Sequence, residues 1–208
     1  MNELKLRIDQ SLIAEWIQPG SRVLDLGCGD GTLLTYLHNH LQASGYGLEI
    51  DPDNVTECVA RGVPVIQSDI DAGLSDFDEE SFDYVIMTQT LQAVHYPHKV
   101  INEMLRVGRE GIVTFPNMGH WRSRMQVAFN GRMPMTPALP YEWYDSPNIH
   151  LCSVRDFEEL CEQEGIEILE YTTVDHAHRT SLGMRLFPNL LGEIAIYRFR
   201  RELGQVIG

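Results

Sequence analysis

Hydrophobic and polar positions repeat with two different periods along this chain. Near the start, one helical face collects five apolar residues, Ile8, Leu12, Ile13, Trp16 and Ile17, and the turn sequence QPGS at 18–21 ends that helix. Shorter apolar runs follow, and helical patterns separate most of them. Strands are predicted at 22–27, 45–50, 64–69, 82–88 and 110–116, and helices at 32–41, 52–62 and 97–107. This alternation indicates βαβ units and a parallel sheet that is covered on both faces.

The regular pattern breaks after Pro116. Residues 117–150 are rich in aromatic residues, arginines and prolines, and they are too many for a passive connection in a compact domain. We interpret them as an insertion over the edge of the sheet, with a helix near 120–130 followed by an irregular lid. A helix at 153–164 and strands at 166–174 and about 192–199 come next, joined by a connecting loop at 175–191. With no helix between them, the two strands are expected to form a hairpin.

These elements predict an α/β fold: a doubly wound, mostly parallel sheet with an antiparallel edge hairpin. The 208 residues suit a single domain, 1–208, that carries the insertion. The net charge of −14 opposes nonspecific nucleic-acid binding, which depends on neutralising phosphates. The absence of a long apolar run argues against a membrane span or signal peptide. Four scattered cysteines favour a reduced, cytoplasmic protein without disulfides or a zinc site.

The sequence RVLDLGCGDGTLL at 22–34 places three alternate glycines, Gly27, Gly29 and Gly31, between a predicted strand and a predicted helix. Glycine weakens both kinds of element, so something must require bare backbone there. Either the turn is merely tight, or a ligand lies against it. Ligands of open α/β sheets sit at the carboxyl ends of the strands, and the N-terminus of the following helix offers free N–H groups. The position favours a ligand.

Asp25, just before these glycines, constrains which ligand it is. The spacing differs from the dinucleotide fingerprint G-x-G-x-x-G, and the phosphate loop G-x-x-x-x-G-K-[ST] is absent. A carboxylate at this place would repel a pyrophosphate but suits an ammonium or sulfonium group. S-adenosylmethionine (SAM), like its product S-adenosylhomocysteine, is a nucleoside ligand without phosphate that carries such a cationic group.

Two more acidic residues follow predicted strands and complete the pattern. Glu49 ends the second strand, where an acid can accept hydrogen bonds from both ribose hydroxyls, and Asp69 ends the third, where an acid can accept from the adenine amine. Ile70 is placed to pack on the adenine face. The full set of expected binding residues is Asp25, Gly27, Cys28, Gly29, Gly31, Glu49, Ile50, Asp69, Ile70 and Gln89.

The segments VLDLGCGDGTLL, GLEID and FDYVIMTQTLQAV resemble the sequential motifs of class I SAM-dependent methyltransferases. The segments RIDQSLIAEWI, FPNMGHWRSR and PYEWYDSPNIHLCSVRDFEEL resemble the MetW family of methionine biosynthesis proteins, and the resemblance extends over nearly the whole chain. This resemblance implies a role in methionine synthesis in company with homoserine O-acyltransferase (MetX), as a SAM-binding accessory or regulatory subunit. The Trp, Tyr, Met and Arg content of the insertion suits either a partner interface or a lid over the SAM pocket.

A catalytically active small-molecule methyltransferase is the alternative. Methyl transfer needs a general base only if the acceptor must lose a proton, and the candidate bases are His95, Tyr96 and His150, with His98 and His120 as further histidines. Many small-molecule methyltransferases have a sequence like LEHV where this chain reads LQAV at 91–94. The pair His95 and His98 lacks a matching carboxylate, so no metal site is expected. The acceptor and the oligomeric state, including a homo-oligomer, stay open.

Overall fold

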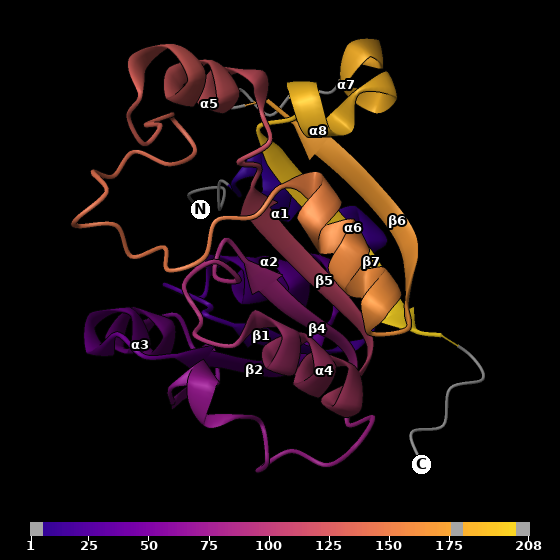
Figure 1. Ribbon diagram of the computed structural model, residues 1–208. Coiled ribbons are helices and arrows are strands. Elements are labelled where there is room, and N and C mark those ends of the chain that lie inside the picture. Colours follow the sequence, from indigo (N-terminus) through magenta and orange to yellow (C-terminus); the bar gives the residue numbers. More distant parts are fainter. Residues whose placement is uncertain (1–5, 176–180, 203–208) are drawn as a thin grey trace.

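The computed structural model describes residues 6–175 and 181–202, which build one seven-stranded sheet with helices on both faces (Figure 1). The strand order is β3-β2-β1-β4-β5-β7-β6, parallel from β3 to β5, while β7 runs antiparallel to β5 and β6. The strands are β1 (Arg22–Leu26), β2 (Ser44–Glu49), β3 (Val65–Gln67), β4 (Phe82–Thr88), β5 (Gly108–Pro116), β6 (Ile166–Val174) and β7 (Ile194–Arg201). The predicted doubly wound α/β fold with an antiparallel edge hairpin is confirmed.

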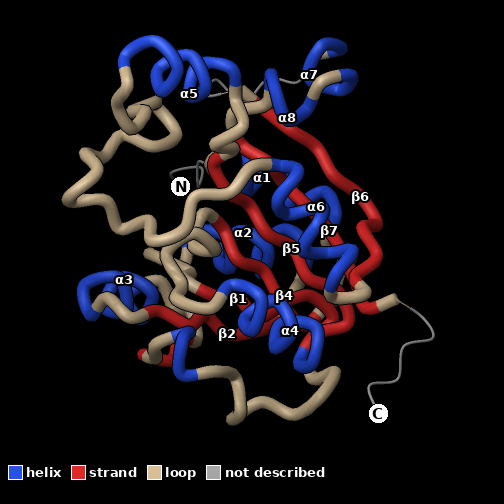
Figure 2. Tube along the Cα trace, viewed as in Figure 1, coloured by secondary structure: helices blue, strands red, loops and turns tan. Residues whose placement is uncertain are grey.

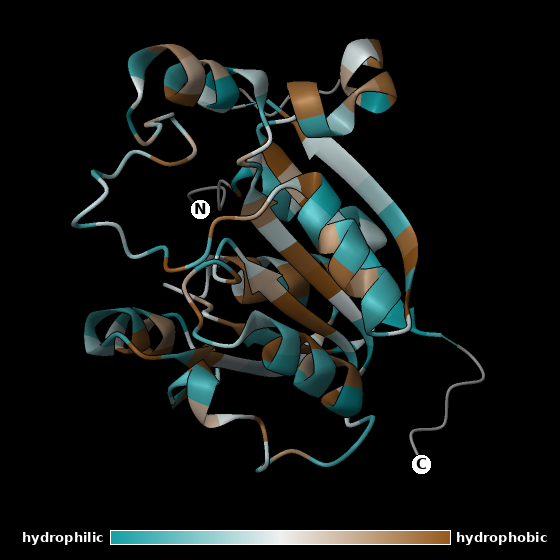
Figure 3. Ribbon diagram, in the orientation of Figure 1, coloured by the Kyte–Doolittle hydropathy of each residue, from teal (hydrophilic) through white to brown (hydrophobic). Residues whose placement is uncertain are grey.

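Two hydrophobic clusters sandwich this sheet. One buries Ile13, Leu37 and Cys58 from the helices on one face, and the other buries Ile101 and Phe157 from the helices on the opposite face. The first face is covered by α1 (Ile8–Trp16), α2 (Thr32–Leu41) and α3 (Pro52–Ala60), and the second by α4 (Pro97–Val107) and α6 (Val154–Gln163). Figure 2 shows the helices wrapped around the strands, and Figure 3 shows that α4 and α6 turn largely hydrophilic sides outward.

The strand order reverses between β1 and β4, which lie side by side at the centre of the sheet. β1 pairs with β2 on one side and with β4 on the other, and chain connections leave these strands in opposite directions. In doubly wound sheets such a reversal opens a crevice outside the carboxyl ends of the strands. The glycine turn after β1 and the residues after β4 therefore meet at this crevice.

The interpretation of residues 175–191 as a connecting loop is wrong for its described part. Two short helices lie there, α7 (Leu182–Leu186) and α8 (Pro188–Leu191), while 176–180 lie outside the described residues. The Ser181 hydroxyl caps α7 by accepting a hydrogen bond from the Met184 N–H, and Pro188 stands at the first position of α8. Helices of five and four residues are too short to show a hydrophobic period in the sequence.

The insertion begins as predicted with a helical segment. α5 (Trp121–Met125) continues into a π-helical turn, η2 (Gln126–Asn130), and irregular chain runs from there to 150. The far end is fixed to the crevice, because the N–H groups of Ile149 and His150 both donate to the Gln92 carbonyl oxygen, at 2.8 and 2.9 Å. Figure 1 shows the insertion beside the carboxyl ends of the central strands. None of the described helices is long and apolar enough to cross a membrane.

Candidate functional site

The three glycines of the turn after β1 all adopt left-handed backbone conformations. Their φ angles are +72° at Gly27, +55° at Gly29 and +74° at Gly31. This region costs an L-residue about 1–2 kcal/mol per position, and glycine avoids most of that cost. The conformation aims the Gly27 N–H at the Leu48 carbonyl oxygen, 2.8 Å away, and ties the turn to the end of β2. The geometry of the turn alone thus accounts for glycine at all three positions.

The space around each glycine separates packing from ligand access. A Cβ on Gly27 would lie 2.7 Å from Thr90 Oγ1, and one on Gly31 would lie 2.9 Å from Cys58 Sγ, so neighbouring side chains fill both places. A Cβ on Gly29 would meet no atom of the described residues within 4 Å. Of the three, only Gly29 leaves open space in front of its backbone, and this is the side on which a ligand can approach.

Asp25 is almost completely buried at the end of β1, with 1 % of its surface exposed. Its Oδ1 atom has no hydrogen-bond partner among the described residues. Burial raises the pKa of this carboxyl to about 7; the nearby Arg7 charge opposes the rise and the Glu49 charge adds to it. An unpaired buried acceptor is costly, so the site fits a ligand that brings a donor or a positive charge.

Glu49 holds the turn and the end of β2 together. Its Oε2 accepts a hydrogen bond from the Gly29 N–H at 2.7 Å, and its Oε1 accepts from the N–H groups of Ile50 and Asp51 at 2.9 and 3.0 Å. A carboxylate has about four acceptor positions, so about one remains for a ligand hydroxyl. The main role of Glu49 is therefore to hold the backbone of the crevice in place, and binding a ligand hydroxyl is a second role.

The predicted binding residues beyond Glu49 lie on neighbouring strand ends. The exposed Asp69 follows β3, caps a short 3₁₀ turn, η1 (Ile70–Ala72), and accepts a hydrogen bond from the Asp71 N–H at 2.9 Å. Ile70 is buried, whereas Ile50 is 62 % exposed. Because β2 and β3 are adjacent and parallel, the structure brings these residues to the same edge as the glycine turn.

Cys28 points away from the crevice. Its Sγ lies 3.8 Å from Cys58 Sγ of α3, both thiols are buried, and Cys28 Sγ fills the space that a Cβ on Gly47 would need. Burial is the main cause that raises the pKa of both thiols, so neither is disposed to ionise. At this position only the backbone is available to a ligand.

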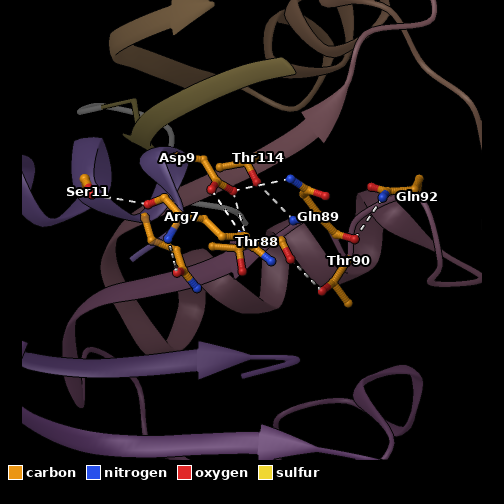
Figure 4. A network of polar contacts seen from close by, with 9 residues as sticks. Arg7, Asp9, Ser11, Thr88, Gln89, Thr90, Gln92 and Thr114 are labelled. Carbon is orange, nitrogen blue, oxygen red and sulfur yellow. Dashed lines mark hydrogen bonds and ion pairs between the residues drawn. The ribbon is translucent and has the colours of Figure 1, made fainter. Parts of the chain in front are cut away.

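A polar network of Arg7, Asp9 and Gln89, of which the sequence predicted only Gln89 as a site residue, borders the crevice on its other side (Figure 4). The Arg7 guanidinium pairs with Asp9, with Nε–Oδ1 at 3.2 Å and Nη2–Oδ2 at 3.1 Å, and Gln89 Nε2 donates to Asp9 Oδ2 at 3.4 Å. Asp9 is fully buried, and Gln89 has a φ of +53°. The sequence did contain one signal of this network: Asp9 lies beside Ile8 on the apolar face of the first predicted helix, where a carboxylate needs a partner.

The three candidate catalytic bases cluster on the surface between the β4–α4 connection and the insertion. His95 Nδ1 lies 2.7 Å from Asp71 Oδ2, and His150 Nε2 lies 3.1 Å from the His95 carbonyl oxygen. Tyr96 is exposed at the start of α4. A cavity of about 470 Å³ adjoins the crevice, and its lining includes none of the three. His120 is buried, and burial lowers its pKa.

Comparison with known proteins places this chain in a family. The family described as "Methionine biosynthesis protein MetW" matches residues 7–199. The chain belongs to the MetW family. A MetW-related protein, the bifunctional methionine biosynthesis protein MetXA/MetW of Rhodopirellula baltica, is 35% identical over 212 residues, which cover 97% of this chain and 34% of that protein. The chain thus spans about a third of the length of this relative.

Other relatives are methyltransferases by name. A phthiotriol/phenolphthiotriol dimycocerosates methyltransferase of Mycobacterium leprae is 36% identical over 100 residues, 44% of this chain and 35% of that protein. A SAM-dependent methyltransferase structure from Mesorhizobium loti has a TM-score of 0.70 at 16% identity, covering 95% of this chain and 100% of that chain. A possible histamine N-methyltransferase from Thermotoga maritima has a TM-score of 0.64 at 18% identity, covering 94% and 88%. At these identities the structures show that this MetW-family chain shares their fold.

Proposed function

We propose that this MetW-family protein binds SAM and serves as an accessory or regulatory partner of homoserine O-acyltransferase (MetX) in the cytoplasm. The observation that carries the ligand half is the pairing of open backbone at Gly29 with the unpartnered buried oxygen of Asp25. The observation that carries the partner half is a relative named MetXA/MetW, of which this chain matches about a third.

Different residues of the crevice would bind different parts of SAM. Asp25 offers its unpaired oxygen to the cationic end of the ligand, and open backbone at Gly29 admits the nucleoside. The remaining acceptor position of Glu49 suits a ribose hydroxyl, and a hydrogen bond to a charged acceptor contributes roughly 1.5–3 kcal/mol. Asp69 and the buried Ile70 suit the adenine amine and ring face. Bound SAM would supply an activated methyl group, and regulation requires no transfer of it.

The insertion is the surface that we assign to the partner. Large apolar side chains stand exposed along it, with Phe129 at 75 % and Trp143 at 76 %. Trp143 also lines a hollow of about 640 Å³ together with Arg132 and Met133. Aromatic, Met and Arg side chains are the types enriched at interface cores, and hollows between them receive partner side chains. A large exposed apolar surface of this kind marks an interaction site.

Binding of SAM and binding of the acyltransferase must influence each other for this protein to regulate. If SAM changes the affinity for the partner by some factor, the partner changes the affinity for SAM by the same factor. The experiment measures the affinity for SAM by calorimetry with and without the acyltransferase, and the affinity for the acyltransferase with and without SAM. The proposal is supported if SAM and the acyltransferase change each other's affinity by the same factor and this factor differs from one. An acyltransferase whose activity and stability ignore this protein would refute the partner half.

The alternative is a small-molecule methyltransferase that uses the same crevice, and the methyltransferase names of relatives and structural neighbours favour it. Against it, His95, Tyr96 and His150 lie outside the lining of the cavity beside the crevice. Incubation of the protein with methyl-labelled SAM and a metabolite extract separates the two functions. Label that appears in a small molecule without the acyltransferase establishes the enzyme, whereas label that stays in SAM supports the regulatory function.

A further inference from the structure

The cavity of about 470 Å³ beside the crevice has walls from four separate parts of the chain. They are Arg7 before α1, residues 89–93 after β4, Ile194 at the start of β7, and the proline-rich part of the insertion at 137–148. Three prolines with fixed φ angles stiffen the last wall, which makes the space a preformed one. Gly29, Glu49 and Asp69 do not line it, whereas Gln89, which belongs to the expected binding set, and Thr90, which packs against Gly27, both do. The cavity is thus the neighbour of the adenosyl crevice.

Two of the polar side chains that line this cavity, Arg7 and Gln92, have hydrogen-bonding atoms without a partner among the described residues. Arg7 uses Nε and Nη2 on Asp9, and within the described part of the chain its Nη1 has no partner. Gln92 is 6 % exposed and donates through Nε2 to the Gln89 carbonyl oxygen at 2.8 Å. Its Oε1 is buried without a hydrogen-bond partner among the described residues, and Gln92 itself lines the cavity. A buried acceptor left unpaired costs about 1–3 kcal/mol.

These groups define what the cavity recognises. A guanidinium pairs best with a carboxylate, and an unpaired amide oxygen requires a hydrogen-bond donor. Ala93, Ala138, Ile194 and the three prolines give the wall its apolar part, and Gln89, Thr90, Tyr141 and Asn148 add further polar groups. We propose that the cavity binds a small free α-amino or α-hydroxy acid, next to the adenosyl ligand. This inference rests on the proposed function only in one respect, namely that SAM or S-adenosylhomocysteine occupies the adjoining crevice.

The methionyl end of SAM carries the same chemical group, so the experiment has to separate the two sources. The protein is first saturated with S-adenosylhomocysteine, which fills the place of a methionyl end. L-2-aminobutyrate, L-2-hydroxybutyrate and butyrate are then titrated into the complex by calorimetry; the three differ only in the group on C2, which is an ammonium, a hydroxyl or a hydrogen. The two acids with a donor should bind at least about tenfold more tightly than butyrate, because a site built around a hydrogen bond rejects an analogue that lacks it.

Variants test the assignment to Gln92 and Arg7. Gln92→Leu should abolish the preference over butyrate, and Arg7→Gln should weaken all three acids. Gln163→Leu is the matched control, because the Gln163 side chain donates a hydrogen bond to Glu159 on the exposed side of α6, away from the cavity lining. The comparison on the unaltered protein stands even if a variant fails to fold. Equal binding of the three acids, or acids that only compete with S-adenosylhomocysteine, would overturn the inference. If S-adenosylhomocysteine fails to bind while the acids bind, the proposed function fails and the inference holds.

Discussion

Asp25 and Glu49 have different roles, although both are buried acids at the ends of neighbouring strands. Glu49 accepts three backbone N–H bonds and so organises the turn, whereas one oxygen of Asp25 has no partner in the part of the chain that the structure describes. The sequence predicted both residues, because an acid at the end of a buried strand stands out. Their division of labour depends on where the backbone N–H groups point, and that information lies in the folded turn rather than in residue types.

Replacing Asp25 by Asn should change how stability depends on pH. The pKa of this carboxyl is about 7 in the fold against 3.8 for the free side chain, so the unfolded chain loses the proton first. The stability that Asp25 contributes is complete below about pH 4 and is lost as the pH rises toward 7. Between pH 5 and 8, urea unfolding should show the free energy of Asp25→Asn gaining roughly 2–3 kcal/mol relative to wild type. Asp76→Asn, in an exposed loop, should show no such gain, and a parallel response of the two variants would contradict the burial argument.

Alanine at Gly29 and at Gly31 should separate ligand access from packing. Gly29→Ala should cost about 1 kcal/mol of stability, because it meets only backbone strain, yet lower the affinity for S-adenosylhomocysteine at least about tenfold. Gly31→Ala also meets Cys58 Sγ and should cost more than about 2 kcal/mol. Gly20→Ala is the control, since Gly20 has a φ of +79° and equally open space. Unchanged affinity in Gly29→Ala would mean that no ligand lies against this backbone.

At the scale of elements, hydrophobic period predicted the regular strands and helices but not the short ones. The periodic runs of β4 and α4 sit close to their predicted places, whereas α7 and α8 depend on Ser181 and Pro188 and on what surrounds them. The network of Arg7, Asp9 and Gln89 was equally out of reach, because it requires that α1 return to the carboxyl end of β4. Contacts between residues 80 positions apart leave no local pattern.

The exposed side chains of the insertion should matter to a partner and not to the fold. Phe129→Ser with Trp143→Ser should change the free energy of unfolding by less than about 0.5 kcal/mol, because both side chains are about three-quarters exposed. The double variant should bind the acyltransferase at least about tenfold more weakly in a calorimetric or pull-down titration. Leu182→Ser on α7, with 73 % exposure, is the matched control. A loss of SAM affinity in place of partner affinity would make the insertion a lid.

At the scale of the whole molecule, the reversal of strand order is what makes one site out of distant parts. It brings the turn after β1, the ends of β2 and β3 and the segment after β4 to one edge of the sheet, and the insertion comes back to Gln92 at that same edge. A ligand in the crevice and a partner on the insertion would therefore contact connected parts of the chain. Under the proposed function, this connection would be the physical route by which SAM binding biases association.

Calorimetric titration of the protein with S-adenosylhomocysteine tests the central claim most directly. The account predicts one saturable site per chain, weakened at least about tenfold by Asp25→Ala and by Glu49→Ala, with Asp76→Ala as the unaffected control. No heat of binding from S-adenosylhomocysteine or SAM, or equal affinity in all three variants, would contradict it.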